Sequence, residues 1–411
     1  MNQTDKKLFQ TLKERGLLYQ CTNEDALKAA LESGEPLVVY EGTDPTASSL
    51  HVGHCVPYCV MRRFQQAGHK VILLMGGATA CIGDPSGKSE LRKMLSKQEI
   101  EQNVGKIKDS LKIFLDFEGE NAAVVVNNAD WYNNLNYIDF MRNVGVHFNV
   151  NKMLSSEIYN NRLESGGLTF FEMGYMLMQA YDFVHLKDKY GCTLEYGGAD
   201  QWANIVAGVE LDRKLCFAHG KTSNLIGATN PLLATKEGKK MGKTERGAIW
   251  IDRDKISAYD FYQGIYQTPD ECVRMMFALF TDDDMADIDK MIAQDIVSAK
   301  KRLAFEVTKF VRGALDAQIA QEASQALFGG GNNLDNAPTI KAKIGDCLID
   351  ILVDSNLCKS KSEARRMLDQ NAIVLNDKIE NSYDRALEDS DLKNGYALLK
   401  RGKKNIIKIV L

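Results

Sequence analysis

Two histidines three residues apart, His51 and His54, have the types and spacing to do chemistry. They close a stretch that reads YEGTDPTASSLHVGH, and an apolar run at 37–39 before it predicts a buried strand. Residues three apart share one face of a helix, so we expect both imidazoles to point the same way from the first helical turn. Gly53 lacks a side chain and lets a flat ligand approach between them. This pattern predicts a site for an anionic phosphate.

A second stretch suited to phosphate lies far downstream, where the chain reads KKMGKT from 239 to 244. Lys240, Lys243 and Thr244 are donors on a glycine-containing loop between two apolar segments. Together the two stretches resemble the HIGH and KMSKS signatures of the class I aminoacyl-tRNA synthetases. The wording Asp-Pro-Thr-Ala at 44–47 narrows the resemblance to the tyrosyl-tRNA synthetase family of the bacterial type, and the match spans most of the chain.

A third stretch, GDPSGKS at 83–89, looks like a phosphate-binding P-loop. That motif needs a glycine five places before its Gly-Lys pair, and this chain has Ile82 there. The sequence therefore disfavours a kinase or GTPase. In the tyrosyl family a similar stretch contributes an aspartate to the amino-acid pocket, and Asp84 matches it.

Three polar side chains, Tyr175, Gln179 and Asp182, fall on one face of an expected helix. Tyrosine and methionine at this spacing usually belong to a core, but a buried amide and carboxylate need partners. A bound amino acid would supply them. The resemblance implies that Tyr175, Gln179 and Asp84 hold the α-ammonium of L-tyrosine. It also implies that Asp182 and Tyr40 hold the phenolic hydroxyl.

The motif Gly-Gly-Ala-Asp-Gln at 197–201 is weak alone and is equally typical of a simple turn. The resemblance implies that Gly198 and Asp200 contact the ribose of ATP and that Gln201 lies near the tyrosine carboxylate. Arg213 and Lys214, which follow a helical pattern, are then candidates for contacting the acceptor end of tRNA(Tyr).

No serine, cysteine or histidine triad is discernible in the sequence, and no metal-ligand cluster. Adenylation needs neither, because an ionised substrate carboxylate can attack the α-phosphorus of ATP itself. The protein has to align the two substrates and neutralise the charge on the leaving pyrophosphate. The resemblance implies ATP as a substrate with Mg²⁺ carried mainly on the nucleotide. The residues expected to act on ATP are Asp44, Thr46, His51, Gly53, His54, Gly198, Asp200, Lys240, Lys243 and Thr244.

The element pattern predicts an α/β fold. Apolar runs at 71–75 and 122–126 read as strands buried on both faces, and a helical stretch at 97–117 separates them. This alternation predicts a doubly wound, Rossmann-like parallel sheet, whose ligands bind outside the carboxyl ends of the strands. An all-α domain and a small α+β module are expected to follow it.

Five segments are predicted along the 411 residues. They are a catalytic domain with a connective insertion at 1–228, the KMSKS-type loop at 229–248, a helical anticodon-binding domain at 249–328, a linker at 329–343 and a final module at 344–411. That module resembles the S4 RNA-binding fold, since a basic helix precedes a strand–turn–strand pattern. Lys361, Arg365 and Arg366 are its expected tRNA contacts, although such a cluster can also be a solvated face.

Composition is consistent with a soluble cytoplasmic enzyme. The formal net charge is −4, the start lacks the apolar core of a signal peptide, and the longest uncharged run is too short to span a bilayer. Nine cysteines without a C-x-x-C pair indicate reduced packing residues, and we expect no structural metal. Homodimerisation is implied by the resemblance alone.

The chain departs from the expected family pattern in three places. Glu41 and Thr43 stand where Cys and Phe are usual, Glu195 replaces a glutamine, and Met241-Gly242 is an intermediate form of the lysine loop. The alternatives left open are a tryptophanyl-tRNA synthetase, a small-molecule adenylyltransferase, and an RNA-binding protein on a degenerate synthetase scaffold. The C-terminal module and the pairing of Asp182 with Tyr40 favour tyrosine.

Overall fold

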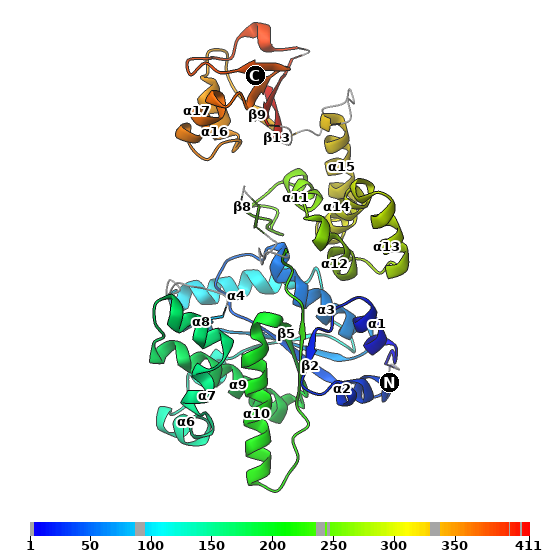
Figure 1. The fold of residues 1–411 in the computed structure, drawn as a ribbon, viewed down its shortest axis with the longest axis vertical. Helices are drawn as coiled ribbons and strands as arrows, with labels where there is room; N and C mark the ends of the chain where they lie inside the picture. Colours follow the sequence, from blue (N-terminus) through cyan, green and yellow to red (C-terminus); the bar gives the residue numbers. More distant parts are fainter. Residues whose placement is uncertain are drawn as a thin grey trace. The chain divides into compact units, whose positions relative to one another are not determined.

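The computed structural model describes residues 4–86, 95–235, 243–244, 247–328, 338–393, 395–402 and 405–411, and at positions 165, 243, 244 and 247 it describes the backbone alone. Its contacts divide the chain into two compact units (Figure 1), Met1–Ile256 with Gly264–Val311, and Ser257–Gln263 with Arg312–Leu411. No described helix is long and apolar enough to cross a membrane.

The first unit is built on a six-stranded sheet in the order β1-β6-β5-β2-β3-β4. Its strands are β1 (Gln20–Cys21), β2 (Val38–Thr43), β3 (Lys70–Met75), β4 (Val124–Asn127), β5 (Leu194–Gly198) and β6 (Ile226–Asn230). All neighbours are parallel except the edge strand β1. The predicted doubly wound parallel sheet is therefore confirmed. The winding reverses between β2 and β5, and ligands of such sheets bind at this reversal.

One expectation about the strands was wrong in part. β3 is buried from Val71 onward, as an inner strand should be. β4, however, is the second edge strand of the described sheet, and Val124 on it is 43% exposed. The helix expected at 97–117 is α4 (Lys97–Leu111), which begins at a capping box of Ser96 and Glu99 and ends six residues earlier.

Two long helices, α9 (Phe170–Tyr190) and α10 (Trp202–Ala218), lie side by side against the sheet (Figure 1). On α9, Phe183 and Leu186 pack on the sheet face that carries Tyr40 and Ile72. A capping box of Thr169 and Glu172 starts α9, and Gly191 ends it with a φ of 68°. Because both ends of α9 are fixed in this way, its polar face has a fixed position over the carboxyl ends of the strands.

Helix α3 (Cys55–Gln66) packs on β2, β3 and β5 and also contacts the helical segment that begins with α12 (Asp270–Phe280). Arg63 of α3 donates to the carbonyls of Ala278 and Thr281 at the end of α12. Arg15, the C-cap residue of α1 (Leu8–Glu14), donates to the same two carbonyls. These donors satisfy carbonyls that the helix leaves without an internal partner. Helices α13 (Met285–Gln294) and α14 (Ile296–Arg312) follow.

The second unit contains a five-stranded sheet in the order β11-β10-β12-β13-β9. Its elements are β9 (Thr339–Lys341), α16 (Leu348–Asp354), α17 (Lys361–Asp369), β10 (Ile373–Leu375), β11 (Lys378–Glu380), β12 (Ala397–Arg401) and β13 (Asn405–Val410). The expected strand–turn–strand is present, with Asn376 and Asp377 at positive φ in the turn. The side chain of Ser360 caps α17 by accepting from the Glu363 N–H.

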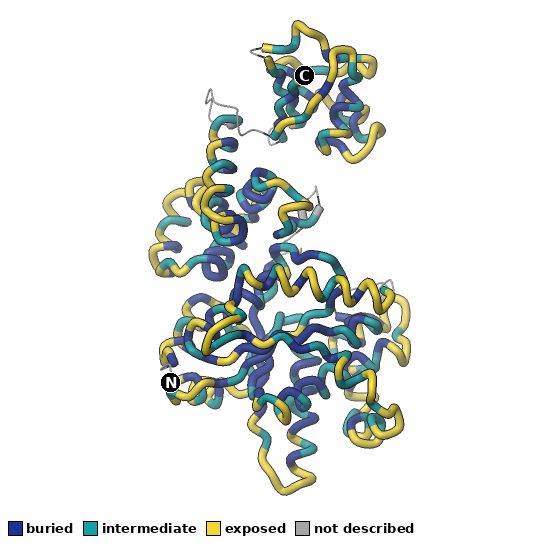
Figure 2. The backbone as a smooth tube through the Cα atoms, turned by 180° about the vertical axis from the view of Figure 1, so that it is seen from behind, coloured by how far each residue is buried: buried dark blue, intermediate teal, exposed yellow. Residues whose placement is uncertain are grey.

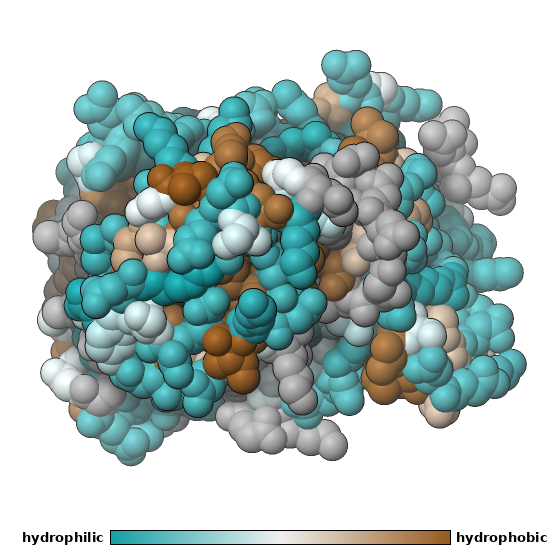
Figure 3. All heavy atoms as spheres, turned by 90° about the horizontal axis from the view of Figure 1, so that it is seen from above, coloured by the Kyte–Doolittle hydropathy of each residue, from teal (hydrophilic) through white to brown (hydrophobic). Residues whose placement is uncertain are grey.

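Each unit has its own buried core, and Figure 2 shows the buried residues gathered along the strands and on the inner sides of the helices. On the face drawn in Figure 3, hydrophilic side chains predominate and hydrophobic ones form small separate patches. Helix α15 (Ala314–Phe328) groups with the second unit and α12–α14 with the first, while α11 (Ala258–Tyr266) spans the division. The two units are defined by packing, whereas the five segments were predicted by function. The five segments therefore stay a prediction.

Tight packing between α10 and the sheet makes a glycine on β6 necessary. A Cβ on Gly227 would meet Ile205 Cγ2 at 2.4 Å, whereas a Cβ on Gly105 of α4 would meet nothing within 4 Å. We expect Gly227→Ala to lower the free energy of unfolding by about 1–3 kcal/mol. The matched Gly105→Ala should leave it unchanged or raise it by roughly 0.5–1 kcal/mol, since alanine is the better helix former. Urea unfolding measures both, and equal midpoints for the two variants would contradict this packing.

Candidate functional site

A cavity of about 660 Å³ opens at the carboxyl ends of β2 and β5, where the sheet reverses its winding. Thirteen of the predicted site residues line it, namely Tyr40, Asp44, Thr46, His51, Gly53, His54, Asp84, Tyr175, Gln179, Asp182, Gly198, Asp200 and Gln201. The structure therefore brings four distant stretches of sequence around one space.

The two histidines stand as expected on one side of this cavity. The short 3₁₀ turn η1 (Val52–His54) runs into α3, and the rings of His51 and His54 stack with centroids 3.6 Å apart. His51 is also bridged to Trp250, and Val52 donates its N–H to the Ile249 carbonyl. This pairing fixes the turn at the N-terminus of α3, where both imidazoles line the cavity.

Asp44 and Asp84 are each held by donors from other segments. Asp44 accepts from the hydroxyls of Thr79 at 2.7 Å and Tyr175 at 3.0 Å. Asp84 accepts from the Gln201 amide at 2.7 Å and from Ser86. The resemblance assigned Tyr175 and Asp84 to one ammonium group, yet the structure joins Tyr175 to Asp44. Their roles toward a ligand stay a prediction.

Asp182 is 1% exposed, and burial raises its pKa to about 7. Its carboxylate accepts from Asn128 Nδ2 at 3.0 Å and from Trp131 Nε1 at 2.9 Å, and both donors oppose the rise. The sequence reasoning missed Asn128 and Trp131. Their place in the sequence could have revealed them. They directly follow the carboxyl end of β4, and ligands of such a sheet bind at that edge.

A second buried carboxylate, Glu195, faces the same cavity from β5. Its register partner on β2 is Tyr40, so both side chains leave the sheet on one face. Glu195 Oε1 accepts from Gln179 Nε2 at 3.0 Å. Burial raises the pKa of Glu195 to about 7 and that of Glu41, bonded to Thr43, to about 8. The cavity thus holds carboxyl groups that titrate near neutrality.

The downstream loop is described only in part. Lys240 lies outside the described residues, as do Lys239, Met241 and Gly242. Lys243 and Thr244 form the strand β7 (Lys243–Thr244), for which the backbone alone is described, and it pairs with β8 (Gly247–Ala248). The predicted roles of Lys240, Lys243 and Thr244 stay predictions.

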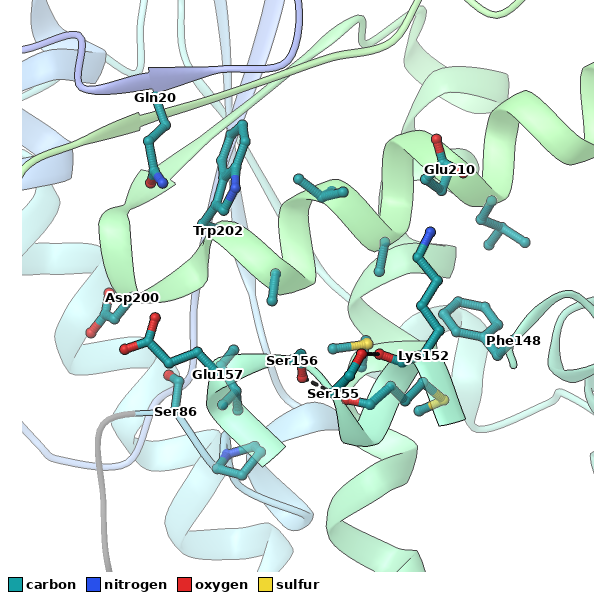
Figure 4. A pocket seen from close by; sticks show the side chains of 18 of the residues that line it. Gln20, Ser86, Phe148, Lys152, Ser155, Ser156, Glu157, Asp200, Trp202 and Glu210 are labelled. Carbon is teal, nitrogen blue, oxygen red and sulfur yellow. Dashed lines mark hydrogen bonds between the residues drawn. The ribbon is translucent and has the colours of Figure 1, made fainter. Parts of the chain in front are cut away.

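A larger cavity of about 1100 Å³ adjoins the first, and Ser86, Asp200 and Leu232 line both. Figure 4 shows Lys152 from α7 (Val150–Leu154) and Trp202 from α10 on its walls. Of the two predicted basic residues, Lys214 lines this cavity and donates to the His147 carbonyl. Arg213 does not line it and is paired with Glu210 at 2.9 Å.

The predicted basic residues of the second unit lie on α17. Lys361 is paired with Asp350 at 2.5 Å, while Arg365 and Arg366 are exposed. An exposed ion pair of this kind contributes little to stability, so Lys361 can exchange its partner at small cost.

Comparison with known proteins places this geometry in a family. A family model described as class I tRNA synthetases (W and Y) matches residues 32–329, and one described as the tyrosine–tRNA ligase SYY-like C-terminal domain matches 331–409. The tyrosine–tRNA ligase of Clostridium kluyveri is 46% identical over 98% of this chain and 99% of its own, and that of Acetivibrio thermocellus is 45% identical over the same shares.

Solved structures agree. A truncated mitochondrial tyrosyl-tRNA synthetase of Aspergillus nidulans matches with a TM-score of 0.67 and 28% identity, over 78% of this chain and 94% of its own. A tryptophanyl-tRNA synthetase from Encephalitozoon cuniculi matches with a TM-score of 0.54 and 14% identity, over 78% of this chain and 92% of its own, which shows a shared fold alone.

The indole of Trp131 stabilises the ionised form of Asp182 by donating to it. We expect Trp131→Phe to raise the pKa of Asp182 from about 7 by roughly one unit. Infrared difference titration of the carboxyl band measures this shift, and Asp182→Asn assigns the band. An unchanged pKa in Trp131→Phe would show that the indole does not hold the charge.

Proposed function

The chain belongs to the tyrosine–tRNA ligase family of class I tRNA synthetases, and from that premise we propose how its two cavities divide the reaction. The first activates L-tyrosine with ATP, and the second receives the acceptor end of tRNA(Tyr). One observation carries the assignment of the first cavity. Its wall presents the stacked imidazoles of His51 and His54, while its floor presents the buried carboxyl group of Asp182 and the buried Tyr40.

In the first step the tyrosine carboxylate attacks the α-phosphorus of ATP. A carboxyl O–P bond forms, the bond to the bridging oxygen breaks, and its electron pair leaves with pyrophosphate. The imidazoles of His51 and His54 donate to the oxygens on which charge grows, which lowers the barrier without a covalent role for the protein. Thr46 lines the same cavity and is proposed to join them.

Magnesium is proposed to arrive on the nucleotide. Among the residues that the structure describes, no three His, Cys, Asp or Glu side chains converge as ligands, and both oxygens of Asp44 already accept hydrogen bonds. This donor set fits a cation that keeps the phosphates and water as its ligands. Bound there, Mg²⁺ would neutralise phosphate charge, while Asp200 and Gly198 hold the ribose.

In the second step a terminal hydroxyl of tRNA attacks the tyrosyl carbonyl, and AMP leaves. The larger cavity adjoins the first and carries Lys152 and Lys214 for phosphates and Trp202 for a base (Figure 4). Arg213 can leave Glu210 for a phosphate. We also propose that α17 contacts a part of the tRNA other than its acceptor end, through Lys361, Arg365 and Arg366. A cytoplasmic location is proposed, because both substrates occur in that compartment.

A homodimer is proposed from exposed apolar side chains. Large hydrophobic residues exposed by more than 45% concentrate between 137 and 171, and they are Tyr137, Ile138, Val146, Val150, Phe170 and Phe171. Water-exposed apolar side chains in such number mark a surface that a partner covers. A second copy of this chain is the occupant that the family implies.

We expect exchange of labelled pyrophosphate into ATP that depends on tyrosine and Mg²⁺. His51→Ala and His54→Ala should each lower kcat roughly 10²–10³-fold with little change in the KM for tyrosine, because donors to developing charge act in the transition state. Asn160→Ala, an exposed change on α8 (Glu157–Ser165), serves as control.

Two outcomes would count against this function. Exchange driven by tryptophan but not by tyrosine would move the chain to the sister enzyme. A raised KM with normal kcat in both histidine variants would mean that these imidazoles bind only the ground state.

A further inference from the structure

The indole of Trp131 contacts helix α9 at two points. Its N–H donates to Asp182 Oδ1 at 2.9 Å, and its ring stacks on the imidazole of His185 with centroids 4.3 Å apart and ring planes 21° apart. Asp182 and His185 are three residues apart on α9, so they share one face of that helix. The same helix face therefore sets both the plane of the indole ring and the partner of its N–H.

The segment that carries Trp131 is too short to fix the indole by itself. Trp131 belongs to α5 (Ala129–Tyr132), a helix of four residues that follows the edge strand β4, and none of the four is buried. Helices this short have little stability of their own. The ring also packs beside the core cluster that contains Tyr40 and Phe183, but apolar packing is not directional. An N–H···O bond is directional and weakens steeply as its angle falls, so the indole plane has to be fixed by another contact.

The imidazole of His185 provides a flat face for this purpose. Burial lowers the pKa of His185 and the charge of Lys189 lowers it further, so the ring is mostly neutral at neutral pH. Its Nε2 is buried and has no hydrogen-bond partner among the described residues. A polar bond at Nε2 therefore does not explain why an aromatic ring lies here. Its ring contacts do, since it stacks on Trp131 and has Tyr181 as a second aromatic neighbour.

We propose that His185 is a positioning residue whose imidazole holds the indole of Trp131 in the orientation that donates to Asp182. His185 is not among the described residues that line the first cavity. The proposal rests on the proposed function, in which Asp182 accepts from the phenolic hydroxyl, and deepens it. It extends the control of amino-acid specificity to a residue outside the cavity.

Three variants separate the flat ring from the rest of the side chain. His185→Phe keeps a flat ring, His185→Ala removes it, and His185→Gln fills part of the space without one. The readout is the ratio of kcat/KM for tyrosine to that for phenylalanine in pyrophosphate exchange. We expect His185→Ala and His185→Gln to lower this ratio roughly 3- to 10-fold and His185→Phe to keep it within about twofold. His219→Ala, the loss of an exposed histidine after α10, is the matched control.

A double-mutant cycle tests whether His185 acts through Trp131. In the Trp131→Phe background the indole N–H is already lost, so His185→Ala should lower the ratio by less than about twofold further. An equal loss in both backgrounds would overturn the proposal, because His185 would then influence the cavity by another route.

Infrared titration of Asp182 gives a readout that does not depend on catalysis. A misaligned indole stabilises the carboxylate less, so the pKa of Asp182 should rise above about 7 in His185→Ala and stay unchanged in His185→Phe. If His185→Ala fails to fold, His185→Gln takes its place in this comparison. An unchanged pKa in the variant without the ring overturns the proposal even where tyrosine-dependent exchange is normal. Absence of tyrosine-dependent exchange in the wild type would instead overturn the proposed function.

Discussion

Burial of the Asp182 carboxylate is the constraint on which the rest of the site depends. A charge removed from water must be matched by donors, and Asn128 and Trp131 supply two of them from the segment after β4. Asn128 also donates to Thr79, whose hydroxyl bonds Asp44. One polar network therefore ties α9, the end of β4 and the loop after β2, and it keeps the cavity floor rigid.

The sheet supplies the other half of the geometry. Because β2 lies between β3 and β5, the chain leaves the sheet on opposite sides at neighbouring strand ends, and a cavity remains between them. Tyr40 and Glu195 are brought together by register, since they are partners across β2 and β5. Two residues 155 positions apart thus act as neighbours through backbone pairing alone.

Local signals explain what could be predicted from the sequence. Strand runs, the His51–His54 spacing and the polar face of α9 are short-range patterns, and the doubly wound sheet and the cavity residues followed from them. Hydrogen-bond partners that are far apart in the sequence could not be predicted, because they depend on tertiary packing. Examples are the bond from Tyr175 to Asp44 and the donors Asn128 and Trp131. The edge position of β4 likewise depends on strand order, which periodicity does not encode.

The central claim is that the buried carboxylate of Asp182 at the cavity floor recognises the substrate's phenolic hydroxyl by accepting a hydrogen bond from it. Discrimination between tyrosine and phenylalanine in pyrophosphate exchange tests it most directly, as the ratio of kcat/KM for the two. Asp182→Ala should lower that ratio by at least roughly 10-fold, because phenylalanine never used the carboxylate, and Tyr40→Phe should lower it less. A ratio unchanged by Asp182→Ala would contradict the account, since another residue would then have to form the floor.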